Sequence, residues 1–454
     1  MIHTFTSCGK YMALDVGSGA VHALDELAYD ALRLYEQGTA LDGIRAQLQG
    51  KHDAAELDET LGEIAQLIEA GQLDSDDDYA SVDVAADPGV VKAMCLLVTQ
   101  DCNLRCKYCF ASAGEYHMHG SRLMSLETGK RALDWLVQKS GKRRSLEVDF
   151  FGGEPLMNFD VVRELVAYGR SLEQAHDKQF KFTITTNAVA LTDEMIDFFN
   201  REMHNVVLSI DGRPEVHDRM RPTPNGKGSY ELMAPKALRL AKARGQRDYY
   251  VRGTYSAYNL DFANDVLHLA DLGFEQISVE PVVADPACGY ALTEDMLPAL
   301  RDEYERLARI YVQRRREPGK WFNFFHFMVD LNGGPCLKKR LTGCGAGNEY
   351  VAVTTDGDIY PCHQFVGREG YRMGSVLDGS FDAGIQRTFA ENHVLNKEKC
   401  SKCWARFYCS GGCAANAQAF GGDIRTPYDM ECELERKRLE CAMAIYAAEH
   451  EDEA

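Results

Sequence analysis

Shortly after the apolar run 93–98, the chain reads Asp101-Cys102-Asn103-Leu104-Arg105-Cys106-Lys107-Tyr108-Cys109-Phe110. The three cysteines have the spacing C-x3-C-x2-C. Three closely spaced thiolates with no fourth beside them can hold an iron–sulfur cube and leave one iron without a protein ligand. A structural zinc ion is the alternative, but closed zinc sites have four ligands and this run supplies three.

The length and composition of the chain limit the class of protein that it can be. The chain has 454 residues, which indicates two or three domains. It has no apolar run of about 18 residues and no signal-peptide pattern at Met1, so we expect a cytoplasmic protein without a membrane partner. Fifteen cysteines in such a chain indicate metal or redox chemistry rather than disulfides. The net charge of −19 argues against nucleic acid as a partner.

The middle of the chain, residues 90–320, alternates short apolar runs with helical patterns. This alternation predicts a parallel sheet with helices outside it, and chemistry at the carboxyl ends of the strands. The expected strands are 93–98, 146–151, 181–185, 206–210, 249–254 and 276–279. The expected helices are 126–138, 161–172, 193–200, 234–243 and 263–272.

A glycine motif, Gly152-Gly153-Glu154-Pro155, lies one strand–helix unit after the cysteine run. With Phe110 after the last cysteine, these features resemble the radical S-adenosylmethionine (SAM) enzymes. The resemblance implies an α/β fold with a partial (β/α)6 barrel and an open iron that binds SAM. It also implies that the reduced cluster cleaves SAM to a 5′-deoxyadenosyl radical.

The same resemblance implies a set of SAM contacts. Glycines let the backbone approach a ligand, and a carboxylate suits the methionine amino group. Residues at the ends of the following strands suit the ribose hydroxyls, and an arginine fork suits the SAM carboxylate. The candidates are Gly152, Gly153, Glu154, Asn187, Ser209, Asp211 and Arg252. Glu280 and Arg221 are further candidates, with a surface salt bridge as the alternative for each.

Residues 1–85 form a separate acidic block with four Lys/Arg against seventeen Asp/Glu. Two short strands, 11–14 and 20–24, precede three helical patterns around residues 27–35, 44–48 and 61–68. This order resembles the winged-helix-like recognition domain of ribosomal-peptide maturases, which binds a leader peptide by strand addition. The alternatives are a DNA-binding winged helix, which the acidic balance opposes, and a plain stabilising domain.

The last block, residues 325–454, has the pattern C-x12-G-x4-C, then C-x2-C-x5-C-x3-C, then a final cysteine. It resembles the SPASM domain, which implies two auxiliary [4Fe–4S] clusters and thus three in all. The resemblance assigns Cys344, Cys362 and Cys413 to one cluster. It assigns Cys400, Cys403, Cys409 and Cys432 to the other. Two zinc sites in a ribbon-like fold are the alternative.

Seven cysteines leave the first auxiliary cluster one ligand short. Cys336 is the candidate fourth ligand, and an open iron that binds a substrate thiolate is the alternative. Cys336 and His363 are the candidates for a catalytic role, and the sequence identifies no general base. Cys8, Cys95, Cys288 and Cys441 have no motif partners, so we expect small buried apolar roles for them.

Four stretches (14–22, 106–113, 146–161 and 343–367) resemble the maturases of SCIFF peptides, which carry six cysteines in forty-five residues. The family joins a cysteine sulfur to a threonine α-carbon in a cysteine-rich precursor peptide. It implies a low-potential electron donor such as a ferredoxin or flavodoxin. The alternatives are a sulfatase-type or carbon–carbon crosslinking SPASM maturase, and a non-enzymatic zinc-bound regulator.

Overall fold

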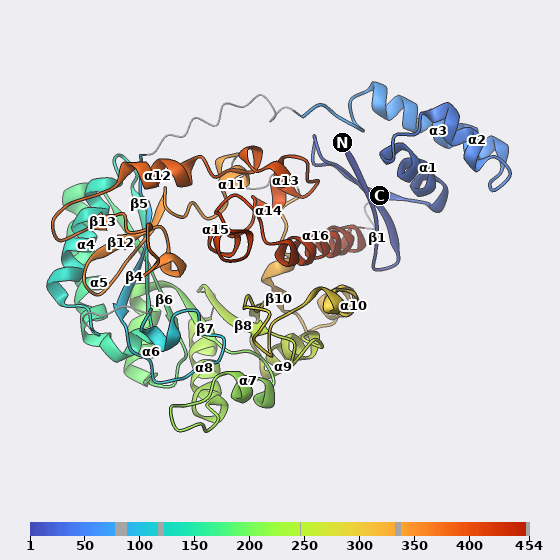
Figure 1. The fold of residues 1–454 in the computed structure, drawn as a ribbon. Helices are drawn as coiled ribbons and strands as arrows, with labels where there is room; N and C mark the ends of the chain where they lie inside the picture. The colour runs from blue at the N-terminus through green and yellow to red at the C-terminus, as the bar shows by residue number, and fades with distance from the viewer. Residues whose placement is uncertain (78–88, 117–121, 246, 332–336, 451–454) are drawn as a thin grey trace.

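The computed structural model describes residues 1–77, 89–116, 122–245, 247–331 and 337–450. It has a small N-terminal domain, a curved mostly parallel sheet with helices outside it, and a C-terminal region (Figure 1). Among these described residues, no helix is both long and apolar enough to cross a membrane.

The N-terminal domain is a three-stranded antiparallel sheet followed by three helices. The sheet order is β1-β2-β3, which leaves β3 on one edge. Leu27, Ala31, Ile44, Leu61 and Ile64 are buried in its core. The elements are β1 (Ile2–Ser7), β2 (Lys10–Asp15), β3 (Val21–Leu24), α1 (Glu26–Glu36), α2 (Leu41–Leu48) and α3 (Ala54–Glu69). The sequence analysis missed β1, whose buried positions do not alternate regularly.

Six parallel strands form the centre of the large sheet, so the predicted α/β fold is confirmed. Each predicted strand is present, extended by one to three residues at one or both ends in most cases. The strands are β4 (Ala93–Thr99), β5 (Ser145–Gly152), β6 (Gln179–Thr186), β7 (Met203–Ser209), β8 (Tyr249–Tyr255) and β9 (Gln276–Pro281). Every residue of β4 is buried, as expected of a strand covered on both faces.

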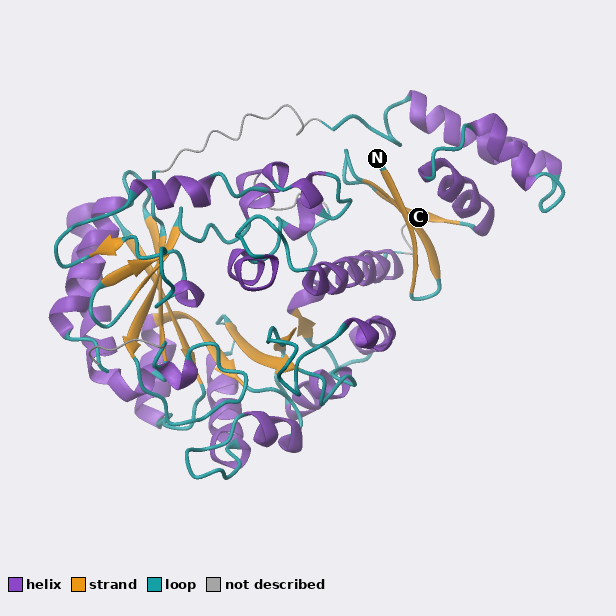
Figure 2. Cartoon of the chain, in the orientation of Figure 1, coloured by secondary structure: helices purple, strands orange, loops and turns teal. Residues whose placement is uncertain are grey.

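Helices cover the convex face of this sheet (Figure 2). They are α4 (Leu126–Lys139), α5 (Phe159–His176), α6 (Asp193–Glu202), α7 (Pro214–Met220), α8 (Tyr230–Arg244), α9 (Ala263–Leu272) and α10 (Leu297–Arg316). Alternate residues of β5, namely Leu146, Val148 and Phe150, pack into the core beneath them. The side chains between those residues, such as Asp149, therefore face the opposite, concave side of the sheet.

The C-terminal region extends the same sheet instead of forming one of its own. Strand β10 (Asn323–Phe324) pairs with β9, and β11 (Tyr350–Val353) pairs in parallel with β4. Strands β12 (Asp358–Tyr360) and β13 (Gly374–Ser375) continue beyond β11. The remaining helices are α11 (Leu337–Thr342), α12 (Ala383–Ala390), α13 (Glu398–Ser401), α14 (Arg406–Cys409), α15 (Ala414–Asn416) and α16 (Asp429–Glu449).

The N-terminal domain packs against the C-terminal region. Strand β1 lies beside α16 (Figure 1). Phe5, Met12 and Leu14 form one buried apolar cluster with Met443 of α16. This contact holds the N-terminal sheet next to the C-terminal cysteines.

Candidate functional site

The first cysteine group lies in the loop after β4. Burial raises the pKa of the Cys102 thiol to about 12 and that of Cys106 to about 11, and the neighbouring thiol charges add to both shifts. The backbone amides of Leu104 and Ala113 donate to the sulfurs of Cys102 and Cys109, at 3.5 and 3.3 Å. A thiol in such a place becomes a ligand only when a bound cation stabilises its thiolate, so the group fits an iron–sulfur cluster.

The glycine motif touches this loop through backbone alone. The amide of Gly153 donates to the carbonyl of Thr99, and that of Glu154 donates to the carbonyl of Asp101, both at 2.9 Å. A Cβ added at Gly152, where φ is +134°, would lie 2.2 Å from the Thr99 oxygen. A Cβ at Gly153 would lie 2.1 Å from the Asp101 oxygen. Glycine is therefore required here to bring β5 against the cysteine loop.

Glu154 is buried and fixes the geometry of this corner. Its carboxylate accepts hydrogen bonds from Thr186 Oγ1 at 2.6 Å, from the Asn187 amide at 2.8 Å and from the Leu156 amide at 3.1 Å. Burial raises its pKa to about 7. The Asn187 side chain donates in turn to Asn103 Oδ1 at 2.7 Å. Glu154 and Asn187 thus tie β6 to the cysteine loop.

Other predicted SAM contacts already have protein partners. Asp211 is fully buried and accepts from Tyr108 Oη and from the Thr254 amide. Arg221 forms an ion pair with Asp211 at 3.0 Å. This pair is buried, so the surface salt bridge considered for Arg221 is wrong. Ser209 ends β7 and is half-buried.

Arg252 and Glu280 meet across neighbouring strands. The Arg252 Nη2 and Nε atoms donate to the two oxygens of Glu280 at 2.6 and 3.1 Å. The fork keeps the pKa of Glu280 at about 2, against the effect of burial. The Arg252 side chain is still half-exposed and lies on the concave face with Asp149 and Ser209.

One C-terminal cysteine group surrounds a single cavity. Cys400, Cys403, Cys409 and Cys432 all line it. Burial raises the pKa of Cys432 to about 12 and that of Cys409 well above its ordinary value. The structure thus brings together four cysteines that are spread over 33 sequence positions.

The other group contains Cys344, Cys362 and Cys413. Burial raises the pKa of Cys362 to about 12, and the charges of Cys413 and Cys344 raise it further. Cys336 lies outside the described residues. Glu431, which the sequence analysis missed, accepts from the Cys413 amide at 3.4 Å and precedes Cys432. The sequence indicated Glu431 only through its position next to Cys432.

The described residues contain no compact site for a single metal ion. Among the residues that the structure describes, no three His, Cys, Asp or Glu side chains converge tightly enough to hold one metal ion. The compact arrangement expected of a zinc site is therefore not seen in that part of the chain.

Aromatic contacts join the first cysteine group to the group of Cys362. The His363 ring lies 5.2 Å from the ring of Phe110 and 5.1 Å from that of Phe151. Its Nδ1 atom is 3.2 Å from Tyr350 Oη. Burial and the charge of Arg252 lower its pKa to about 4. His363 is therefore packed between the rings of Phe110 and Phe151.

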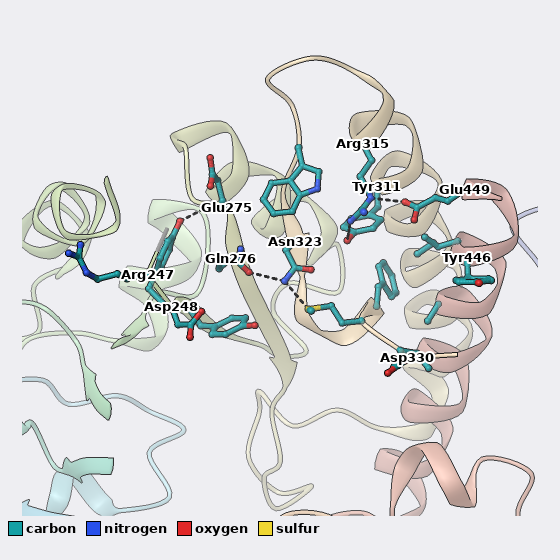
Figure 3. A pocket seen from close by; sticks show the side chains of 18 of the residues that line it. Arg247, Asp248, Glu275, Gln276, Tyr311, Arg315, Asn323, Asp330, Tyr446 and Glu449 are labelled. Carbon is teal, nitrogen blue, oxygen red and sulfur yellow. Dashed lines mark hydrogen bonds and ion pairs between the residues drawn. The ribbon is translucent and has the colours of Figure 1, made fainter. Parts of the chain in front are cut away.

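A cavity of about 930 Å³ lies where the strands of the sheet begin, at the end opposite the cysteine loop (Figure 3). Tyr249, Gln276 and Asn323 line it from the first residues of β8, β9 and β10. The cysteine loop follows the last residue of β4, so this cavity is separate from the cysteine site.

Comparison with protein families agrees with the cysteine groups. The model described as the radical SAM superfamily matches residues 96–255. The SPASM model, described as an iron–sulfur cluster-binding domain, matches residues 344–404. The chain contains a radical SAM domain and a SPASM domain. SAM and [4Fe–4S] clusters are the cofactors that these domains imply, and the donor sets above fit them.

Some known proteins are similar to this chain in sequence, and a solved structure is similar to it in fold. The cysteine-type anaerobic sulfatase-maturating enzyme of Clostridium novyi is 24% identical over 349 residues, which are 72% of this chain and 90% of that enzyme. The PqqA peptide cyclase of Bradyrhizobium diazoefficiens is 28% identical over 360 residues, 76% of this chain and 87% of the cyclase. The solved structure of anSMEcpe with bound AdoMet has a TM-score of 0.65 at 18% identity and covers 79% of this chain and 99% of its own. The radical SAM/SPASM chain described here is therefore similar to protein and peptide maturases.

Proposed function

We propose that this radical SAM/SPASM protein is a thioether-forming maturase that joins a cysteine sulfur to a threonine α-carbon in a cysteine-rich precursor peptide. The similarity to a peptide cyclase and to sulfatase maturases supports a peptide substrate. The three domains of the proposal are residues 1–85 for leader recognition, 90–320 for the SAM barrel and 325–454 for two auxiliary clusters. A ferredoxin or flavodoxin is the proposed electron donor.

One observation carries the proposal: a small sheet with an unpaired edge is docked on a cysteine group. Trp404, Arg406 and Tyr408 lie between Cys403 and Cys409, and each contacts the N-terminal domain. Trp404 stacks on His3, Arg406 pairs with Asp77 at 2.7 Å, and Tyr408 Oη donates to the Gly19 carbonyl at 3.3 Å. A peptide that adds a strand to the β3 edge is thereby held at a fixed place relative to this cysteine group.

The residues of the first cysteine group have separate tasks in this proposal. Cys102, Cys106 and Cys109 hold the cluster, and Glu154 and Asn187 fix the loop against β6. When bound and reduced, such a cluster with SAM supplies a 5′-deoxyadenosyl radical that removes a hydrogen atom. Gly152 and Gly153, the proposed contacts for the methionine end of SAM, hold β5 close to the cysteine loop, where an added Cβ would meet the backbone of Thr99 or Asp101.

The concave face supplies the remaining contacts of the proposal. Arg252 is half-exposed and can turn one donor to the SAM carboxylate while Glu280 keeps the other. Ser209 is placed for a ribose hydroxyl. Asp211 is enclosed by Tyr108, Arg221 and Thr254, so the geometry favours a positioning role over the ribose contact expected from sequence.

His363 is the candidate for proton transfer. It is neutral at pH 7 because burial lowers its pKa to about 4. Its low pKa makes it a weak base, and its packing against Phe110 also excludes water from the space between the two cysteine groups. Cys336 stays the proposed fourth ligand beside Cys344, Cys362 and Cys413.

A second candidate function is a sulfatase-type oxidation, because the Clostridium novyi relative aligns over 90% of its own length. The test is anaerobic incubation of reduced protein and SAM with two substrates, a cysteine-rich precursor peptide and a short sulfatase-type peptide. The thioether proposal requires a precursor product lighter by two hydrogens with one thiol lost. Unchanged precursor during verified SAM cleavage, together with oxidation of the short peptide, would establish the second function.

A further inference from the structure

Arg221 faces the cysteine loop from a buried position that neither the fold nor the comparisons explain. It follows the last residue of α7, and only 11% of its side chain is exposed. Two backbone hydrogen bonds straddle it. The Lys107 amide donates to the Met220 carbonyl at 2.8 Å, and the Arg105 amide donates to the Pro222 carbonyl at 2.7 Å. Cys106 and Arg221 are therefore opposite each other in a short backbone pairing.

The guanidinium group lies close to this cysteine. Its central carbon is 5.3 Å from the ring centroid of Tyr108, two residues after Cys106. The backbone pairing and the Tyr108 contact place a fixed positive charge beside Cys106, and such a charge favours negative charge at the sulfur.

Asp211 holds the guanidinium in place. Its carboxylate pairs with Arg221 at 3.0 Å and also accepts from Tyr108 Oη at 2.6 and 2.8 Å. The Thr254 amide adds a bond at 2.9 Å from β8. With the loop, β7 and β8 all attached to one buried ion pair, Arg221 has little freedom to move away from Cys106.

One donor of Arg221 has no acceptor in the described part of the chain. Its Nε atom is buried without a hydrogen-bond partner among the described residues. A buried donor left unpaired costs about 1–3 kcal/mol, so an acceptor is expected when the site is complete. The sulfur atoms of a cluster held by Cys106 are suitable acceptors.

We propose that Arg221 is a positioning residue that raises the reduction potential of the cluster held by Cys102, Cys106 and Cys109. This inference rests on the proposed function of that loop but not on the identity of the peptide product. Reduction adds negative charge to the cluster, and both a hydrogen bond to sulfur and a fixed cation stabilise that charge. A cellular electron donor must produce this reduced cluster, and a higher reduction potential allows a weaker donor to do so.

The test is a redox titration followed by electron paramagnetic resonance on the anaerobic, cluster-loaded protein without SAM. The signal that Cys102→Ala removes identifies the cluster. We expect Arg221→Gln to make reduction about tenfold less favourable, which is ~59 mV for one electron. Arg221→Lys keeps the charge but loses the planar fork, so its shift is smaller.

Arg213→Gln is the matched control. Arg213 lies at the other end of α7 and pairs at 2.8 Å with Asp265, which is as fully buried as Asp211. Its loss also leaves a buried carboxylate unpaired, but no cysteine of the loop is involved. An unchanged potential in this variant, beside a lowered one in Arg221→Gln, supports the proposal.

A double variant, Asp211→Asn with Arg221→Gln, distinguishes an effect on the reduction potential from a failure to fold. Removing Arg221 alone leaves Asp211 uncompensated, which can prevent folding by itself. A loaded double variant with a lowered potential supports the proposal. A native potential in either loaded variant overturns it, because Arg221 then only neutralises Asp211. Since the titration needs no peptide, failure of thioether formation would leave this result intact.

Discussion

His3 of β1 stacks on Trp404, with ring centroids 4.0 Å apart and planes inclined by 8°. His3 also lies between two carboxylates, 3.2 Å from Glu440 and 3.6 Å from Glu36. Trp404 follows Cys403 directly in the chain. The N-terminal sheet is thus attached to the residue next to a proposed cluster ligand, through a side chain that can be protonated.

This attachment should weaken at high pH. Burial lowers the pKa of His3, but its bonds to Glu36 and Glu440 outweigh that effect and the net pKa lies above 6.5. A raised pKa in the folded state means that the stabilisation is fully present below pH 6.5 and is lost as the pH rises through the folded pKa. We expect a loss of about 0.5–1 kcal/mol, seen as faster hydrogen exchange of the β1 amides.

His3→Phe is the control for this pH effect. It keeps a ring against Trp404 and removes the titrating group, so exchange in β1 should no longer depend on pH beyond the intrinsic rate. An equal pH dependence in both proteins would contradict the role of His3.

Gly153→Ala should disrupt the cysteine loop. The added methyl group would lie 2.1 Å from the Asp101 carbonyl, and backbone on both sides leaves no easy relief. We expect a stability loss of about 1–3 kcal/mol and a lower affinity for SAM, measured by thermal unfolding and by SAM binding.

The comparison variant is Gly62→Ala. Gly62 lies in α3 with nothing within 4 Å of its added Cβ, so this variant should gain about 0.4–1 kcal/mol. Equal behaviour of the two variants would show that the glycine motif does not constrain the loop.

Ala23→Pro should weaken leader binding without affecting SAM cleavage. The Asp15 amide donates to the Ala20 carbonyl, and antiparallel bonding alternates along the pairs that follow. The Ala23 amide therefore points to the open edge of β3, where an added strand would accept from it. Its loss should reduce leader affinity roughly two- to tenfold, since one hydrogen bond contributes ~0.5–1.5 kcal/mol.

Titration of a labelled leader peptide measures this change, with Ala23→Val as the variant that keeps the amide. Equal affinity of the proline and valine variants would place the leader elsewhere on the protein.

Cys102→Ala should abolish SAM cleavage and leave the auxiliary iron in place. The three proposed [4Fe–4S] clusters would amount to about twelve irons per chain, so about eight should persist in anaerobic iron and sulfide analysis. Cys288→Ala, at a half-buried cysteine outside all three groups, should keep the full amount. Retained SAM cleavage in Cys102→Ala would refute the assignment of the loop.

Local patterns were sufficient to predict much of the fold. The period-two and helical spacings from Ala93 to Pro281 predicted all six parallel strands, because strand and helix formation depend on side chains near in sequence. Helix α10 was missed, although its buried residues Leu300, Tyr304, Leu307 and Tyr311 repeat at helical spacing. Helix α16 carries a much less clear pattern, because apolar and charged residues are mixed around its surface and two charged ones, Lys437 and Arg438, are buried.

The candidate site, too, could be predicted only in part from the sequence. The spacing of Cys102, Cys106 and Cys109 alone indicated a cluster site, because the three ligands lie within one short loop. No local pattern could indicate that Arg221 faces Cys106 or that His363 packs on Phe110, since these pairs depend on distant segments that meet only in the folded chain. The continuation of the barrel sheet through β11 is of the same kind, because parallel pairing joins residues far apart in sequence. The sequence by itself thus determined which chemistry the chain can carry, and tertiary packing decided which buried charges and rings surround it.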